Sequence, residues 1–154
     1  MLVLRRIRVD LDTWDDFGRA GKELVMARRL DTGAPVTGGG ERDRPDTAKT
    51  DSLGLPVVDP SAHAVRATPR NPAERMLRRG YSFDEGPHAD GTPDAGLLFA
   101  AYQADAATAF VPVQRRLAES DALNKWLTHV GSAAFAIPPG CVEGEFLGQS
   151  LIGA

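Results

Sequence analysis

The sequence of 154 residues predicts an α+β domain with a ferredoxin-like βαββαβ order. Two observations predict this class. Short aliphatic stretches typical of strands alternate with segments of helical periodicity, and a long segment rich in Gly, Pro, Asp and Thr interrupts them. The expected architecture is an antiparallel sheet with both helices on one face and a long irregular insertion. The length, with 42% hydrophobic and 25% charged residues, suits a single domain spanning residues 1–154.

The first strand and the first helix are expected in the N-terminal 30 residues. Leu2 to Val9 reads LVLRRIRV, which is rich in aliphatic residues. Ile7 and Val9 alternate with Arg6 and Arg8, as in a strand with one solvated face. A helix is expected from Thr13 to Arg29, with Asp12 as its N-cap and an end near Gly33.

The insertion is expected to run from Thr32 to Pro60 without regular structure. A loop of this length commonly has a function or is disordered. Its Gly38-Gly39-Gly40 triplet lacks the Gly-Lys-Ser/Thr sequence of a phosphate-binding loop and does not join a strand to a helix.

The remaining elements follow the insertion. Good strands are expected at Gly96 to Gln103 and at Gly131 to Ile137, and a short one at Arg79 to Phe83. Between the two good strands, a helix with Pro112 in its first turn is indicated by Val113, Leu117, Leu123, Trp126 and Leu127.

The predicted sheet has one face that the helices do not cover. In the strand GLLFAAYQ, residues 96–103, apolar side chains alternate onto both faces. A bare second face would be an unusually large exposed apolar patch. We therefore expect a cofactor, a second copy of the chain or a separate domain to cover it.

The composition limits the possible functions. The net charge of −3 argues against general nucleic-acid binding, although five arginines between residues 66 and 79 form a basic stretch suited to a small anion. The single cysteine, Cys141, excludes an internal disulfide and a multi-cysteine zinc site. We expect no membrane span and no export signal in this chain, which would leave it soluble and, as given, cytoplasmic.

His63 is the candidate metal ligand, in a loop or short helical turn. Lone histidines are more often structural or surface residues, and no second ligand lies nearby in the sequence. Haem needs only one axial ligand from the protein, because the macrocycle supplies the other four donors. A single histidine is therefore sufficient for haem but not for zinc.

Several dispersed stretches, in order, resemble the C-terminal half of the DyP-type (dye-decolourising) haem peroxidases, of the bacterial kind related to deferrochelatases. They run nearly end to end: LVLRRIRVDLDTWD, ARRLDTGAPVTG, GLPVVDP, the segment around His63, MLRRGYSF, DAGLLFAAYQAD, FVPVQRRLAESDALN and HVGSAAFAIPPG.

The resemblance implies a ferredoxin-like domain that binds haem b (iron protoporphyrin IX), with the N-terminal half of the enzyme absent. It implies that His63 is the axial iron ligand and that Arg79 is the distal arginine, which polarises the peroxide. It also makes Asp105 the expected hydrogen-bond acceptor for the His63 imidazole. Leu97 and Phe99 are expected to wall the haem.

Each of these roles has an alternative. Asp105 is also suited to cap the helix that follows it. Arg79 is also suited to be a solvated charge or a haem-propionate contact. Leu97 and Phe99 are equally suited to the sheet core.

Two departures from the family pattern stand out. The arginine after the histidine, Arg66, comes one position later than is common in the family. The family's G-x-x-D-G motif, whose aspartate handles the peroxide proton, is missing, and residues 86–91 (GPHADG) are interpreted as a turn.

The expected function is therefore oxidation of an organic electron donor by hydrogen peroxide through ferryl haem, impaired in this chain alone. The alternatives are a non-catalytic dimerisation or interaction module and a haem-sequestering protein. The donor and the cellular location stay open, since full-length relatives are often exported.

Overall fold

A computed structural model describes residues 1–152 as one four-stranded antiparallel sheet with helices on one side. The strands lie in the order β2-β3-β1-β4, and their bounds are β1 (Leu2–Val9), β2 (Leu77–Pro87), β3 (Pro93–Tyr102) and β4 (Leu127–Phe135). The helical segments are α1 (Leu11–Asp16), α2 (Arg19–Met26), α3 (His63–Arg66), η1 (Pro72–Glu74), α4 (Phe110–Ser120), η2 (Ala122–Trp126) and α5 (Gln149–Ile152). The ferredoxin-like α+β class is confirmed.

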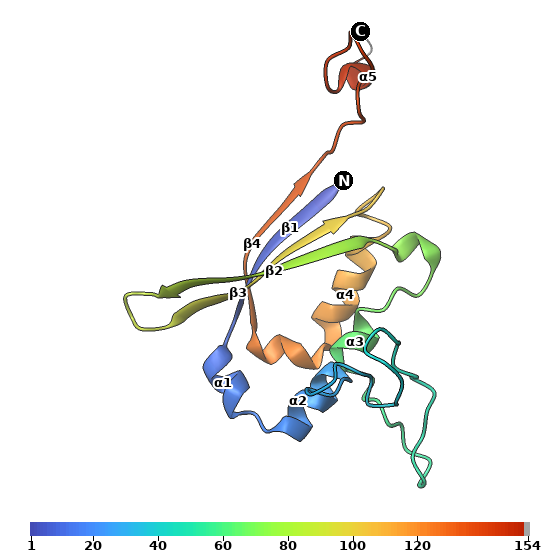
Figure 1. Ribbon diagram of the computed structural model, residues 1–154, viewed down its shortest axis with the longest axis vertical. Helices are drawn as coiled ribbons and strands as arrows, with labels where there is room; N and C mark the ends of the chain where they lie inside the picture. The colour runs from blue at the N-terminus through green and yellow to red at the C-terminus, as the bar shows by residue number, and fades with distance from the viewer. Residues whose placement is uncertain (153–154) are drawn as a thin grey trace.

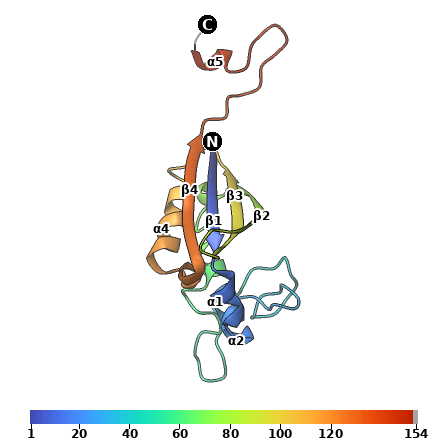
Figure 2. The same cartoon turned by 90° about the vertical axis from the view of Figure 1, so that its left-hand side faces the viewer.

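Apart from α5, the helices gather on one face and at one end of the sheet. Helix α4 runs along one face (Figure 2), while α1, α2 and α3 lie beyond the end of the strands (Figure 1). Side chains of β1 that face α4 include Val3 and Ile7, both at most 9% exposed. Strand alternation then places Leu4 and Arg6 on the opposite face.

The first helix differs from its expected course. Two short helices replace the single helix, because Phe17 adopts an extended conformation and Gly18 starts a second helix. Asp10, not Asp12, is the N-cap of α1, and its carboxylate accepts a hydrogen bond from the Thr13 amide at 3.2 Å. Helix α2 ends at Met26, because its C-cap Ala27 has a positive φ of 56°, and it does not extend to Gly33.

The insertion is irregular, as expected, but it is anchored to the rest of the domain. Between α2 and α3 it contains only turns and two isolated bridges, Arg28 with Pro35 and Thr50 with Pro56. Ala27, Val58 and Ala62 form a small buried cluster where the insertion starts and ends. This cluster holds the start of α3 against α2.

The later strands are longer or shifted relative to the prediction. Strand β2 extends over 11 residues, where only a short strand was expected at residues 79–83. Strand β4 begins at Leu127 and ends at Phe135. A bulge interrupts its pairing with β1, because Ile7 pairs with His129 while Arg6 pairs with Gly131, which leaves Val130 unpaired.

The face of the sheet opposite α4 carries exposed apolar side chains. Five of them are between 37% and 60% exposed: Leu4, Leu77, Tyr81, Tyr102 and Phe135. Beyond β4, residues 136–152 leave the sheet as an extension that ends in α5 (Figure 1). Among the helices described, none has both the length and the apolar character that a membrane crossing requires.

A buried ion pair fixes the segment between α3 and β2 to α4. The Arg116 guanidinium, on α4, donates to both oxygens of Glu74, at 3.1 and 2.7 Å, and to the carbonyl of Thr68 at 3.1 Å. Glu74 and Arg116 are 5% and 8% exposed. The hydrogen bond from Arg116 is the main cause that lowers the pKa of the Glu74 carboxyl.

Replacing Glu74 with Gln is expected to lower the free energy of unfolding by about 3–5 kcal/mol, because it leaves the Arg116 charge buried without its counter-ion. Urea unfolding at pH 7 measures this loss. Glu119→Gln, at an exposed position on the same helix, is the matched control and should change the stability by about 0.5 kcal/mol or less. Equal effects of the two substitutions would contradict a stabilising role for the pair.

Candidate functional site

A cavity of about 250 Å³ lies between the α4 side of the sheet and the helices. Most of its lining is apolar: Ile7, Val9, Trp14, Ala67, Met76, Leu97, Phe99, Phe110, Val113, Leu117, Leu123 and Leu127. The polar lining is limited to Arg5, His63, Arg78, Gln114, Asp121, Asn124 and His129. An apolar cavity with a few convergent polar groups is typical of a small-molecule or cofactor site.

His63 enters this cavity from the start of α3. The turn before it is held by Asp59, whose carboxylate accepts hydrogen bonds from the Ser61 amide at 2.7 Å and the Ser61 hydroxyl at 2.6 Å. The next residue, Ala62, is fully buried. The amide of Ala122 donates to the Ser61 carbonyl at 2.9 Å, which ties this turn to η2. The backbone that carries His63 is therefore fixed from two sides.

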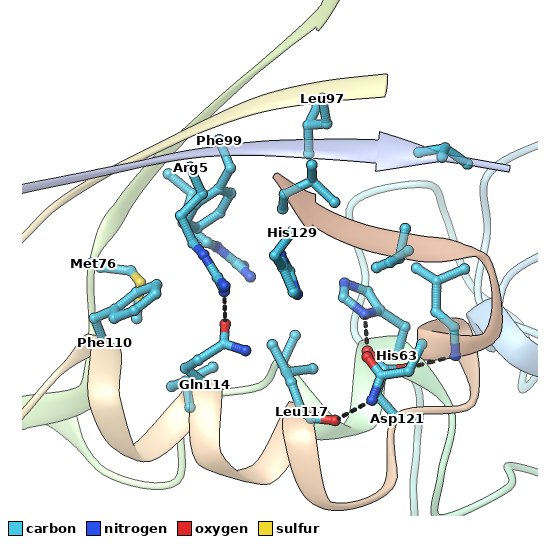
Figure 3. Close-up of a pocket in the computed structure, with 18 of the residues that line it drawn as sticks. Arg5, His63, Met76, Leu97, Phe99, Phe110, Gln114, Leu117, Asp121 and His129 are labelled. Atoms are coloured by element: carbon cyan, nitrogen blue, oxygen red, sulfur yellow. Dashed lines mark hydrogen bonds and ion pairs between the residues drawn. The ribbon is translucent and has the colours of Figure 1, made fainter. Parts of the chain in front are cut away.

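The imidazole of His63 is oriented by Asp121. Nδ1 donates to Oδ2 of Asp121 at 2.6 Å, and the Asp121 side chain is 1% exposed (Figure 3). The other oxygen, Oδ1, accepts a hydrogen bond from the Leu123 amide at 3.0 Å and caps η2. A histidine held through Nδ1 by a carboxylate has Nε2 available as a metal ligand, and the carboxylate raises its basicity.

The prediction that Asp105 accepts a hydrogen bond from the His63 imidazole was wrong. Asp105 does not contact the imidazole, because its Oδ1 accepts a hydrogen bond from the Ala107 amide at 2.9 Å at an exposed turn. This is the capping alternative. Asp121 lies 58 residues after His63 in the sequence, and no local pattern connects the two. One helix was expected from Val113 to Leu127, so nothing in the sequence marked Asp121 as a capping residue.

The structure does not place Arg79, the expected distal arginine, at the cavity. Arg78 pairs with Ala101 of β3, and Gly80 pairs with Phe99, so these residues share the cavity face of the sheet. Arg79 pairs with Ala100 and lies on the opposite face. Arg78 lines the cavity and Arg79 does not. In the sequence Arg-Arg, only the strand register decides between the two residues.

Leu97 and Phe99 line the cavity, each from β3. The Phe99 ring lies 6.4 Å from the Phe110 ring of α4, centroid to centroid. These two residues therefore form part of the wall between the sheet and α4. Whether they contact haem stays a prediction.

Two further polar residues of the cavity, Arg5 and His129, were not foreseen. Both are on the cavity face, and Figure 3 shows His129 between Arg5 and His63. Burial lowers the pKa of the Arg5 guanidinium. Loss of hydration lowers the pKa of His129, and the positive charge of Arg5 lowers it further. The alternation of residues 5 to 9 indicated the face of Arg5 but not the presence of a cavity.

These residues fit a haem better than a metal ion bound by protein alone. Within residues 1–152, no group of three or more His, Cys, Asp or Glu side chains could hold a metal ion. One oriented imidazole at an apolar cavity supplies the donor that a macrocycle requires. Apolar walls and two arginines suit a flat ligand that carries acidic groups.

The lowered pKa of His129 predicts a pH dependence of stability. The unfolded chain takes up a proton near the ordinary pKa of about 6.5, whereas the folded chain resists protonation until a lower pH. Stability is thus lost as the pH falls from about 7 toward 5. Urea unfolding across this range should give a shallower loss for His129→Gln than for the wild type. Identical pH profiles would contradict the assigned shift.

Comparisons with known proteins show which family this chain resembles. The sequence profile described as "Dyp-type peroxidase, C-terminal" matches residues 1–142. The chain is 50% identical over 153 residues to the dye-decolorizing peroxidase of Thermobifida fusca (strain YX), a match covering 98% of this chain and 35% of that protein. It is 37% identical over 156 residues to the deferrochelatase of Yersinia pestis bv. Antiqua (strain Nepal516), with 99% and 35% covered.

Solved structures of DyP-type peroxidases also match this chain. The crystal structure of the DyP-type peroxidase from Cellulomonas bogoriensis matches with a TM-score of 0.93 and 48% identity, over 99% of this chain and 42% of that chain. Ferric DtpA from Streptomyces lividans matches with a TM-score of 0.90 and 44% identity, over 99% and 42%. The chain thus spans about a third of the length of these curated relatives. It belongs to the Dyp-type peroxidase family and corresponds to the C-terminal domain of that family.

Proposed function

We propose that this chain is the haem-binding domain of a DyP-type peroxidase, with His63 as the axial ligand of haem b. The observation that carries the proposal is the contact between His63 and the buried Asp121 at the edge of an apolar cavity. The carboxylate holds the ring in one orientation and directs Nε2 to coordination. When bound, haem would supply the redox chemistry by which hydrogen peroxide oxidises an organic donor.

Asp121 has a further role in this proposal. Its negative charge, shared through the hydrogen bond with Nδ1, makes the imidazole a stronger electron donor to a bound metal. The same carboxylate is 1% exposed and accepts the Leu123 amide bond, so it has little freedom to turn away. The strength of the His63 ligand therefore depends on how well η2 holds Asp121.

Arg78 replaces Arg79 in this proposal as the arginine that faces peroxide. It belongs to the sheet wall of the cavity, whereas His63 belongs to the helical wall. A guanidinium keeps its charge at all ordinary pH values, and it donates hydrogen bonds to a peroxide oxygen on which negative charge develops. Arg78 is exposed, which suits a position that a small polar oxidant must reach.

The exposed apolar face of the sheet is evidence that this domain has a binding partner. We propose that the N-terminal half of a DyP-type peroxidase covers Leu4, Leu77, Tyr81 and Tyr102, either in the same chain or as a separate one. The chain spans 35% of the Thermobifida relative, and the aspartate of the family's G-x-x-D-G motif is expected in that other half. The second candidate is a homodimer through the same face, favoured by its exposed apolar side chains.

Haem binding by the purified chain tests the axial ligand. Adding haemin should produce a Soret band in the wild type and none, or a shifted and at least tenfold weaker one, in His63→Ala. Asp121→Asn should weaken haem binding by about 10–100-fold, because the ring loses its charged partner. His88→Ala, at an exposed position, is the matched control and should bind like the wild type. An unchanged band in His63→Ala would contradict the proposal.

A pair of adjacent substitutions tests the peroxide-facing arginine. Arg78→Gln in the haem-loaded chain should slow its reaction with hydrogen peroxide by about 10²–10³-fold, the loss expected on removal of one preorganised donor. Arg79→Gln, on the opposite face of the same strand, should react at the wild-type rate. Stopped-flow absorbance at the Soret band measures both. A slow Arg79→Gln beside a normal Arg78→Gln would reverse the assignment.

A further inference from the structure

The cavity carries more positive than negative charge. Two arginines, Arg5 and Arg78, line it, against a single carboxylate, Asp121. Asp121 is occupied by His63 and by the Leu123 amide. Arg78 is exposed, whereas Arg5 is half-buried. A charged group that a ligand covers and removes from water is normally paired, so this excess of positive charge indicates that the ligand of the cavity brings negative charge with it.

Arg5 is the clearest case of an incompletely paired cation. Its Nε donates to the Ser132 hydroxyl at 2.9 Å and its Nη1 to the Gln114 amide oxygen at 2.5 Å, and both partners are neutral. No carboxylate contacts Arg5 in the part of the chain that the structure describes. Its neighbour Arg6, on the other face of the sheet, contacts Glu85 at 2.9 Å and Asp94 at 2.7 Å. Arg6 is therefore paired with two carboxylates, whereas the partners of Arg5 are neutral.

The neutral partners of Arg5 fix its guanidinium and leave part of it available. Ser132, on β4, and Gln114, on α4, bind two of its three nitrogens from different elements. Nη2 has no partner among residues 1–152. A guanidinium fixed in this way loses little conformational entropy when it binds a further acceptor.

The bulge in β4 brings a second donor to the same place. Without it, strand alternation would put His129 and Ser132 on opposite faces, because they are three residues apart. The unpaired Val130 shifts the register, so that His129 pairs with Ile7 and Ser132 with Arg5, both on the cavity face. The irregularity therefore assembles Arg5, His129 and Ser132 into one polar group on an apolar wall.

We infer that Arg5, assisted by His129, binds a carboxylate of the ligand that occupies the cavity, which is a propionate of the tetrapyrrole. The identity of the ligand rests on the proposed function, whereas the preference for an acidic group rests on the charges of the cavity. Nη2 of Arg5 donates to the carboxylate, and the His129 ring adds a second hydrogen bond. Such charge-assisted bonds are the strong ones.

Metal-free protoporphyrin IX and its dimethyl ester test this inference on the full chain. The two differ only in their carboxylates, and without iron neither needs an axial ligand. Fluorescence titration should show that the wild type binds the diacid at least tenfold more tightly than the diester. Arg5→Gln should reduce this preference to about twofold or less, and His129→Gln should reduce it partly. Arg8→Gln, on the same strand but the other face, should retain it.

The diester also reports on folding. The affinity for the diester should be the same in the wild type and in Arg5→Gln. A variant that fails to fold would instead bind neither the diacid nor the diester. His129→Gln, which leaves the Arg5 charge in place, then tests the site independently. Equal wild-type affinities for the diacid and the diester, binding of neither, or a preference that survives Arg5→Gln would overturn the inference.

This experiment separates the inference from the proposed function. If His63→Ala keeps its haemin Soret band while the diacid preference depends on Arg5, the axial ligand is wrong and the carboxylate site stands. If the Soret band depends on His63 while the preference for the diacid over the diester does not depend on Arg5, His63 is supported as the axial ligand and the carboxylate site is wrong.

Discussion

The contact between His63 and Asp121 is the constraint on which the cavity depends. It joins α3 to the start of η2 across 58 residues of sequence, with 2.6 Å between Nδ1 and Oδ2. Helix α3 has only four residues, too few to be stable by itself. Its position comes from its surroundings: the capped turn at Asp59, the backbone bond from Ala122 to Ser61, and the buried pair of Glu74 and Arg116.

This arrangement explains how a cavity persists beside a small core. The buried residues near α3 are mostly small, such as Ala27, Ala62 and Ala67, and they contribute less apolar burial than large side chains would. Polar contacts between the ends of short elements then hold the helical wall at a distance from the sheet. The cost of burying these groups is offset because almost all of them have partners, with Gln103 and the Nε of Arg66 as exceptions.

The sequence was sufficient to predict the order of the elements, the irregular insertion and the face of the sheet that the helices leave uncovered, because local periodicity and alternation determine these features. The resemblance to a family pointed to His63, which the structure places at the cavity, while its role as the axial ligand stays a prediction. The sequence failed for Asp105 and Arg79, since their roles depend on tertiary contacts and on strand register, and a shift of one residue moves a side chain to the other face. Asp121, Arg5 and His129 could not be found, because only the folded chain brings them together.

The bulge at Val130 has a second effect, on how the chain behaves toward other chains. Strand β4 is at the edge of the sheet, and within residues 1–152 one side of its backbone has no neighbouring strand. A regular edge strand is a template on which further strands add in aggregation, whereas a bulge twists the edge and interrupts the ladder. The extra residue in β4 therefore lowers the tendency of this domain to polymerise edge to edge.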